Sequence, residues 1–180
     1  MVVVNAQESG DGEMRRAVRA AGLAVALSCT PALAENPSLL QKFGDWSAYG
    51  TAADPKVCFA VSQPKDMAPK NVKRGPVYFY VSAWPAEKVV NEVSVKMGYP
   101  FKPGGMVTVT VGSDKFELFT KEEGAFVEKP ETEAALIAAM RTGSNITVEG
   151  ISARGTKTSD TYSLSGAGDA LDRIAKECGS

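Results

Sequence analysis

The sequence predicts an all-β domain that carries one or two short helices towards its C-terminal end. Apolar residues come in short runs, and several of these runs alternate apolar with polar residues, which is the pattern of strands. Clusters of glycine, proline and aspartate separate the runs and predict turns. Strands follow one another with few helices between them, so we expect an antiparallel sandwich or barrel and not a doubly wound sheet.

Residues 75–103 are expected to form the centre of the sheet. Two strand-like runs, residues 77–84 and 91–98, flank a short connection. In the second run the apolar residues at 93, 95 and 97 alternate with polar ones, so one face of that strand should be buried. A turn rich in proline and glycine closes the stretch.

The remaining strands are placed by the same criteria. The first is expected at residues 43–49, with Trp46 facing inward, after a polar lead-in at 35–42. A second strand is expected at 57–63, and residues 64–75 are expected to form a loop. Further strands are expected at 106–111, 115–120, 125–127, 145–153 and 156–164.

Two helices are expected because the hydrophobic period lengthens towards the end of the chain. From Pro130, Leu136 and Met140 fall on one side of a helix, acidic residues fill its first turn and a glycine ends it. Residues 167–178 carry apolar residues at helical spacing and predict a second, amphipathic helix.

The N-terminal segment is typical of a secretory signal peptide. A basic stretch at 14–19 precedes a short apolar stretch at 20–28, and Ala32 and Ala34 give the small-x-small cleavage pattern before Glu35. The apolar stretch is shorter than the roughly 20 residues that a transmembrane helix needs.

Residues 1–13 are polar and acidic, which does not suit an export signal, so we expect translation to begin at Met14. The expected organisation is an extension and signal peptide at 1–34 and a single domain at 35–180. That domain should be periplasmic or secreted, and not membrane-spanning.

The composition is that of an ordinary soluble globular protein, with 44% hydrophobic and 23% charged residues. The formal net charge of −1 gives no bulk field that would draw nucleic acid. The chain has no histidine, which excludes histidine-based triads, histidine-ligated zinc and the usual general base near neutral pH. No spacing fits a calcium loop or a phosphate cradle, so we expect no metal, no cofactor and no enzymatic activity.

Cysteine usage predicts one disulfide. Cys29 lies in the signal segment, and Cys58 and Cys178 remain as an even pair in an exported chain. Their bond would close a loop of about 120 residues and contribute roughly 4–5 kcal/mol in the chain-entropy account. The alternative is a reactive thiol at Cys58, which needs an activating base that no histidine can supply.

Two patterns resemble catalytic signatures without their context. Ser62 and Lys65 fit S-x-x-K, but Ser62 ends an expected strand and does not begin a helix, as that chemistry requires. Glu122 and Glu123 are neighbours at a turn, whereas glycosidase carboxylates face each other across a cleft. We interpret both patterns as coincidence.

A candidate partner-binding surface combines aromatic and basic residues. Trp84 and Tyr99 lie next to prolines at strand ends and are the aromatic residues expected to be exposed, which suits an interface. Lys70, Lys73 and Arg74 would give the 64–75 loop a basic contact patch. Two alternatives stay open, because strand aromatics commonly pack in the core and charged loops are commonly only solvated. The richest aromatic cluster is Tyr78, Phe79, Tyr80, Trp84, Tyr99 and Phe101.

Eight blocks spread over nearly the whole mature chain carry a family resemblance: residues 43–46, 58–60, 69–76, 85–89, 91–95, 98–104, 152–156 and 160–164. They resemble the invasion-associated locus B family of alphaproteobacteria. The resemblance implies an exported β-sandwich protein, linked in some members to entry into host cells, and it brings no catalytic residues.

We therefore expect an all-β protein with one or two short helices, built as an antiparallel immunoglobulin-like β-sandwich. It should bind a protein or cell-envelope partner without enzymatic activity and could take part in host-cell interaction. The alternative is a small-ligand binding protein or an envelope enzyme with a cleft between the sheets. A deep pocket with convergent polar groups favours this alternative, and an exposed apolar patch favours partner binding.

The signal-peptide hypothesis predicts where the exported chain begins. N-terminal sequencing of protein recovered from the periplasm or medium should show Glu35 as the first residue, because cleavage follows Ala34. An intact Met1 on the exported protein would contradict both the cleavage site and the proposed start at Met14.

Overall fold

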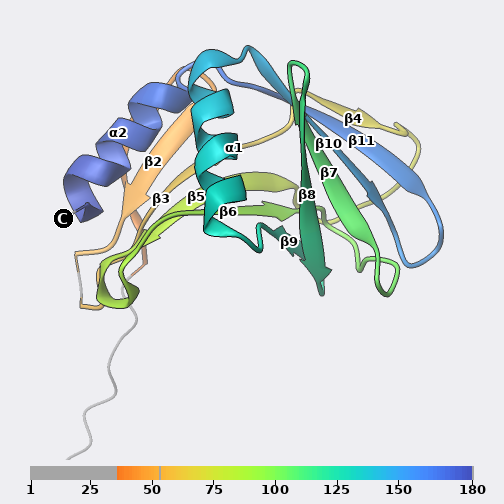
Figure 1. Ribbon diagram of the computed structural model, residues 1–180, viewed down its shortest axis with the longest axis horizontal. Helices are drawn as coiled ribbons and strands as arrows, with labels where there is room; N and C mark the ends of the chain where they lie inside the picture. The colour runs from red at the N-terminus through yellow and green to blue at the C-terminus, as the bar shows by residue number, and fades with distance from the viewer. Residues whose placement is uncertain (1–35, 53, 180) are drawn as a thin grey trace, which may run out of the picture. The chain divides into compact units, whose positions relative to one another are not determined.

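Eleven antiparallel strands form one continuous sheet in the computed structural model, which describes residues 36–52 and 54–179 (Figure 1). The expected extension, signal peptide and cleavage site, together with Cys29, lie outside the described residues. The strand order is β1-β2-β3-β5-β6-β9-β8-β7-β10-β11-β4. The prediction of an all-β fold with two short helices is confirmed.

The elements follow the sequence closely. The strands are β1 (Ser38–Phe43), β2 (Trp46–Gly50), β3 (Cys58–Ser62), β4 (Asp66–Ala68), β5 (Tyr78–Trp84), β6 (Val89–Lys96), β7 (Met106–Val111), β8 (Asp114–Lys121), β9 (Gly124–Phe126), β10 (Asn145–Ile151) and β11 (Lys157–Ser163). The helices are α1 (Pro130–Thr142) and α2 (Ala167–Cys178), and η1 (Pro85–Glu87) is a 3₁₀ turn.

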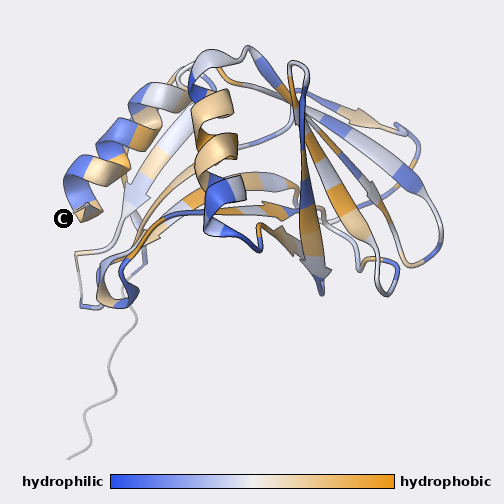
Figure 2. Ribbon diagram, in the orientation of Figure 1, coloured by the Kyte–Doolittle hydropathy of each residue, from blue (hydrophilic) through white to orange (hydrophobic). Residues whose placement is uncertain are grey.

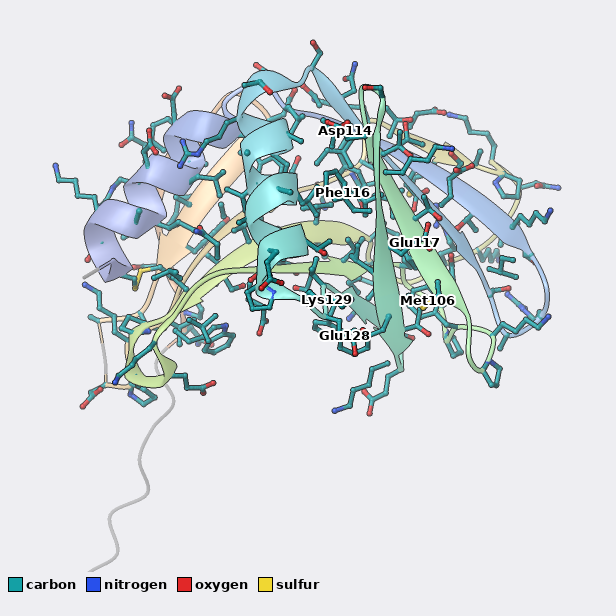
Figure 3. The ribbon with its side chains drawn as sticks, viewed as in Figure 1. Met106, Asp114, Phe116, Glu117, Glu128 and Lys129 are labelled. Atoms are coloured by element: carbon teal, nitrogen blue, oxygen red, sulfur yellow. A yellow bond between two sulfur atoms is a disulfide. The ribbon has the colours of Figure 1, made fainter. Side chains whose placement is uncertain are left out.

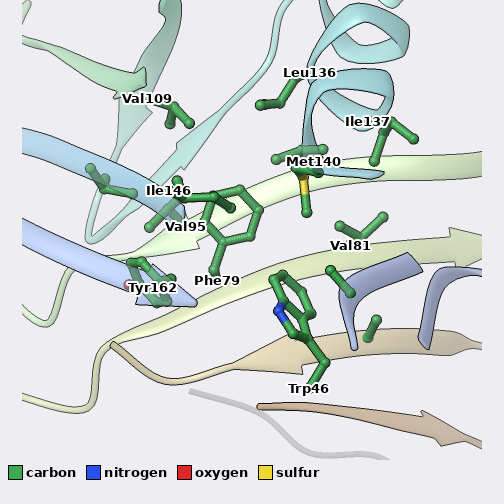
Figure 4. Close-up of a cluster of buried hydrophobic side chains, with 14 of the residues drawn as sticks. Trp46, Phe79, Val81, Val95, Val109, Leu136, Ile137, Met140, Ile146 and Tyr162 are labelled. Atoms are coloured by element: carbon green, nitrogen blue, oxygen red, sulfur yellow. The ribbon is translucent and has the colours of Figure 1, made fainter. Parts of the chain in front are cut away.

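One face of the sheet carries the hydrophobic core, and we call the opposite face the outer face. Strand side chains alternate between the two faces, so β2 and β3 alternate buried and half-buried residues. Figure 4 shows the core side chains from both halves of the sheet converging, with Trp46, Phe79 and Tyr162 among them. Trp46 is fully buried, as expected.

The sheet curls until strands near its two ends meet. The Trp46 indole Nε1 on β2 donates a hydrogen bond of 2.9 Å to the Ser163 carbonyl on β11. The Lys65 amide donates one of 2.7 Å to the Thr161 carbonyl, also on β11. These bonds satisfy polar groups at the curled margin, which would otherwise be costly where water is excluded.

The two helices pack on the core side of the sheet. Helix α2 contacts β1, β2, β3 and β5, while α1 contacts β6, β7 and β8. In Figure 2 the first turn of α1 is hydrophilic and the later turns are hydrophobic. That first turn also contacts the sheet, because the Glu133 carboxylate accepts a 2.8 Å hydrogen bond from the Val93 amide on β6.

The start of the sheet differs from its expected form. Residues 43–49 were expected to make one strand, but the chain turns at Gly44 and residues 35–42 contribute most of a separate strand, β1. Gly44 has φ +54°, and a β-carbon there would lie 2.6 Å from the Ser165 carbonyl oxygen. The turn therefore requires glycine. The alternation of apolar residues continues through Gly44 and so gave no sign of the turn.

The connection between β3 and β5 also differs. Residues 64–75 were expected to form a loop, but they contain the three-residue strand β4, which pairs with β11. A strand of three residues is too short for a detectable alternation. The finer expectation of an immunoglobulin-like sandwich is not confirmed, because the described strands belong to a single curled sheet and not to two separate ones.

Within the described residues, no helix is both long enough and apolar enough to cross a membrane.

Cys58 and Cys178 form the expected disulfide, with their Cα atoms 5.9 Å apart. The bond joins β3 to the end of α2. Both cysteines are buried, and the Lys56–Glu177 ion pair of 2.8 Å lies beside them in sequence. The end of α2 is therefore held to the sheet by a covalent bond and an ion pair.

Removing this disulfide should lower the free energy of unfolding. We expect Cys58→Ala/Cys178→Ala to lose about 4 kcal/mol, because the unfolded chain regains the freedom of a loop of 120 residues. Urea unfolding at neutral pH measures the difference, with the reduced wild-type protein as the matched control. A loss below about 1 kcal/mol would mean that the closed loop does not limit the unfolded chain.

Candidate binding surface

Two residues of the expected contact surface are buried. Arg74 and Tyr99 were predicted to be exposed, but the Arg74 side chain is only 4% exposed and Tyr99 is 6% exposed. The prediction of exposure is wrong for both residues. The segment around Arg74 folds back against β11, so the guanidinium group lies in the protein interior.

Arg74 forms a two-point ion pair with Asp160 of β11. One guanidinium nitrogen, Nη1, donates to Oδ2 over 2.9 Å, and Nη2 donates to Oδ1. Asp160 is fully buried, and the Arg74 guanidinium carbon lies 5.8 Å from the centre of the Tyr99 ring. The hydrogen bonds to Asp160 raise the pKa of Arg74 above its usual value.

Tyr99 is held in the same cluster by its hydroxyl. That hydroxyl lies 2.6 Å from the Thr158 hydroxyl on β11, and burial raises the pKa of Tyr99. The Tyr162 hydroxyl is also buried and has no hydrogen-bond partner among the described residues. The cluster stabilises the curled sheet, and its buried groups are inaccessible to a macromolecular partner.

The other residues of the expected surface remain accessible to different degrees. Lys70 and Lys73 are exposed, and Lys70 pairs with Asp66. Trp84 is half-buried at the end of β5, and its indole Nε1 is buried without a hydrogen-bond partner in the described part of the chain. A role for Lys70, Lys73 and Trp84 in partner binding stays a prediction.

The structure instead brings aromatic residues together on the outer face. Seven side chains stand directly opposite one another on seven neighbouring strands, and none of them is buried. We call them the cross-strand row: Ser47 (β2), Val61 (β3), Tyr80 (β5), Ser94 (β6), Phe126 (β9), Phe119 (β8) and Met106 (β7).

Three further aromatic rings lie beside the row, on β2, β3 and β5. Tyr49 and Phe59 stack with centroids 5.2 Å apart, and Phe59 meets the edge of Tyr80 at 6.0 Å. Tyr78 lies 5.6 Å from Tyr80. We call Tyr49, Phe59 and Tyr78 the flanking rings. Partial burial raises the pKa of Tyr80, so its hydroxyl stays protonated at neutral pH.

At the other end Phe119 and Phe126 pack with centroids 5.7 Å apart. The Phe126 ring extends over Gly124, where a β-carbon would lie 2.9 Å from two ring atoms. Glycine at this position therefore lets the ring lie close to the backbone. Phe119 is 39% exposed and Met106 48% exposed, which is high for large apolar side chains.

Three surface cavities adjoin the cross-strand row. One of about 430 Å³ includes Ser47 and Val61, and one of about 540 Å³ includes Tyr80, Ser94 and Phe126. A third of about 340 Å³ lies at the Met106 end, where Figure 3 shows Met106 on β7 and Phe116 and Glu117 on β8. Figure 3 also labels Glu128 and Lys129, which line this cavity next to α1.

Charged groups near the row occur with both signs. The first cavity holds Lys42, Lys65 and Asp45, and a hydrogen bond from Lys65 is the main cause of the lowered pKa of Asp45. The second holds Lys96, Lys121, Glu122 and Glu123, with Lys96 and Glu123 3.9 Å apart. The described residues contain no group of three acidic or cysteine side chains that could hold a metal ion.

The other half of the outer face is different. There Thr110, Thr147 and Thr161 stand opposite one another on β7, β10 and β11. Sequence reasoning singled out Tyr78 and Tyr80 but missed Phe59, Phe119 and Phe126 as surface residues. Their outward positions follow from alternation within each strand, whereas their alignment depends on the register between strands, which the sequence does not reveal.

The buried ion pair yields a stability prediction. Asp160→Ala should lower the free energy of unfolding by about 3–5 kcal/mol, because it leaves the Arg74 guanidinium buried without its partner. Chemical denaturation measures the loss. Arg74→Met/Asp160→Leu removes both charges and should lose less than the single change. If the double variant loses as much, packing and not the unpaired charge sets the cost.

A family model described as "Invasion associated locus B (IalB) protein" matches residues 46–175. Among solved structures, a crystal structure of invasion associated protein B from Bartonella henselae matches with a TM-score of 0.56 and 18% sequence identity, covering 78% of this chain and 98% of that chain. At this identity the likeness shows a shared fold alone. The comparison with curated proteins found no match.

The family match runs from β2 into α2 and covers well over half of the chain, so this protein belongs to the invasion-associated locus B family.

Proposed function

We propose that this protein is an exported, non-enzymatic binding protein whose cross-strand row contacts a component of the cell envelope or of a host cell. The observation that carries the proposal is the row itself. Aromatic and aliphatic side chains that could have been buried stand half-exposed on the outer face, while both helices pack on the opposite face. Exposed apolar side chains that lie next to one another are characteristic of interaction sites.

The contrast between the two halves of the outer face supports the proposal. Strands β7, β10 and β11 present threonines outward, which is ordinary for a solvated sheet face. The half formed by β2, β3, β5 and β9 presents rings that pack against one another. Packed rings lose little further conformational freedom on binding, which makes them effective contacts.

Family membership supports export and a role outside the cytoplasm. The related structure is named for invasion, and the buried disulfide suits an oxidising compartment. The alternative, a ligand or reaction in a cleft between sheet layers, is less favoured. The space between the two halves of the curled sheet holds the packed side chains of Trp46, Phe79 and Tyr162, which are fully buried.

Binding to a sedimented envelope fraction tests this function. The purified protein should pellet with the fraction, and Tyr80→Ala/Phe126→Ala should weaken retention by about tenfold or more, because it removes two central rings. Thr110→Ala/Thr147→Ala on the other half of the outer face is the matched control and should pellet like the wild type.

Two further variants separate this surface from the one expected from the sequence alone. Trp84→Ala and Lys70→Ala/Lys73→Ala should leave retention unchanged. The proposed contact would be wrong if the Tyr80→Ala/Phe126→Ala variant were retained like the wild type while the Trp84→Ala or the Lys70→Ala/Lys73→Ala variant lost retention. The contact would then lie outside the cross-strand row.

A further inference from the structure

The direction of the cross-strand row restricts the ligands that could lie along it. The row runs perpendicular to the strands, through residues whose backbone groups already take part in the sheet ladders. A ligand laid along it meets side chains and gains no backbone hydrogen bonds, unlike a peptide added to a sheet edge. An extended peptide would therefore leave its own amides without strand partners.

The row combines aromatic rings with hydroxyl groups. Tyr80, Phe126 and Phe119 offer aromatic faces, and Ser47 and Ser94 offer hydroxyls on the same line of side chains. A complementary ligand presents apolar faces together with hydroxyl-bearing edges. Sugar rings do this, because their carbon-bound hydrogens form an apolar face and their hydroxyls project from the edge.

Charge disfavours an anionic ligand. All seven members of the row are uncharged. Each of the three cavities beside it holds acidic as well as lysine side chains, and the pairs Lys65–Asp45 and Lys96–Glu123 neutralise part of the positive charge. A polyanion or an anionic membrane surface is attracted by unpaired basic groups, which exert a net positive field.

The spacing of the row suits a chain of sugar units. Neighbouring strands lie about 4.8 Å apart, so the six steps of the row measure about 29 Å along the curved outer face. One strand-to-strand step is comparable with the length of one hexose in an extended chain. The row would accommodate about six sugar units, one for each step.

We propose that the ligand of the cross-strand row is an extended, uncharged glycan chain. This inference rests on the function proposed above and specifies the chemistry of its ligand. Tyr80, Phe126 and Phe119 stack against sugar rings, and the flanking rings Tyr49 and Tyr78 widen the contact at the β2 end. Gly124 is a positioning residue, because it lets the Phe126 ring lie close to the sheet.

A glycan array carrying neutral and anionic chains of different lengths tests the inference, followed by calorimetry with neutral hexasaccharides such as hexa-N-acetylchitohexaose and cellohexaose. At least one neutral chain should bind, and the hexasaccharide should bind more tightly than its disaccharide. Tyr80→Ala and Phe126→Ala should each raise Kd by about tenfold. Thr110→Ala/Thr147→Ala should leave Kd unchanged.

Two conservative changes separate ring stacking from loss of folding. Tyr80→Phe keeps the ring and should retain most of the affinity. Gly124→Ala displaces the Phe126 ring without removing it and should weaken binding, with an unchanged far-ultraviolet circular dichroism spectrum to show that the fold is kept.

Several outcomes would overturn the inference. These are the absence of binding to every neutral chain, equal binding by the Tyr80→Ala variant, or salt-sensitive binding confined to heparin or to anionic lipid vesicles. If no neutral glycan binds but retention on the envelope fraction still depends on Tyr80 and Phe126, the ligand is a protein or lipid and the proposed function stands. If retention does not depend on these residues, the proposed function is itself wrong.

Discussion

The curled sheet depends on the buried ion pair between Arg74 and Asp160. The segment between β3 and β5 must reach the edge of β11, where β4 pairs with it, and return, and this ion pair fixes its return at a point that excludes water. Both charges are removed from solvent, so a change that leaves either one without its partner is strongly destabilising. Tyr99 and Thr158 fix the geometry further through the ring contact and the hydroxyl bond. The ion pair and the backbone pairing of β4 with β11 hold this segment on the sheet together.

The curl determines what each face of the sheet can do. Because β2 meets β11 and the two helices cover the remaining opening, the core side is filled by buried side chains. The outer face is left exposed. Strand register then aligns seven outward side chains into one row, so the proposed binding surface arises from pairing across strands and not from a loop or a single motif.

The sequence predicted the positions of the strands and helices more successfully than how these elements pair and pack. Alternation and turn residues located β7, α1 and α2 almost to the residue, and the even pair of cysteines predicted the bond between Cys58 and Cys178. It missed β4, which is too short to show a period, and it could not reveal that Arg74 and Tyr99 turn inward towards a distant strand. The cross-strand row required the register, which depends on long-range pairing and leaves no local signal.

The contact between Glu133 and β6 gives the fold a response to acid. Burial raises the pKa of Glu133 although its hydrogen bond from Val93 opposes the shift, so the folded protein binds this proton more tightly than the unfolded chain does. The contribution of Glu133 to stability therefore improves as the pH falls through its raised pKa, and weakens above it. Glu177 behaves in the opposite way, because hydrogen bonds from Lys56 and Arg173 lower its pKa to about 2. The stability that these bonds contribute falls as the pH drops below the usual glutamate pKa and is lost as the pH passes through this lowered value. With no histidine in the chain, the response to acid comes from such carboxylates: acidification favours the packing of α1 on β6 and weakens the ion pairs at the end of α2.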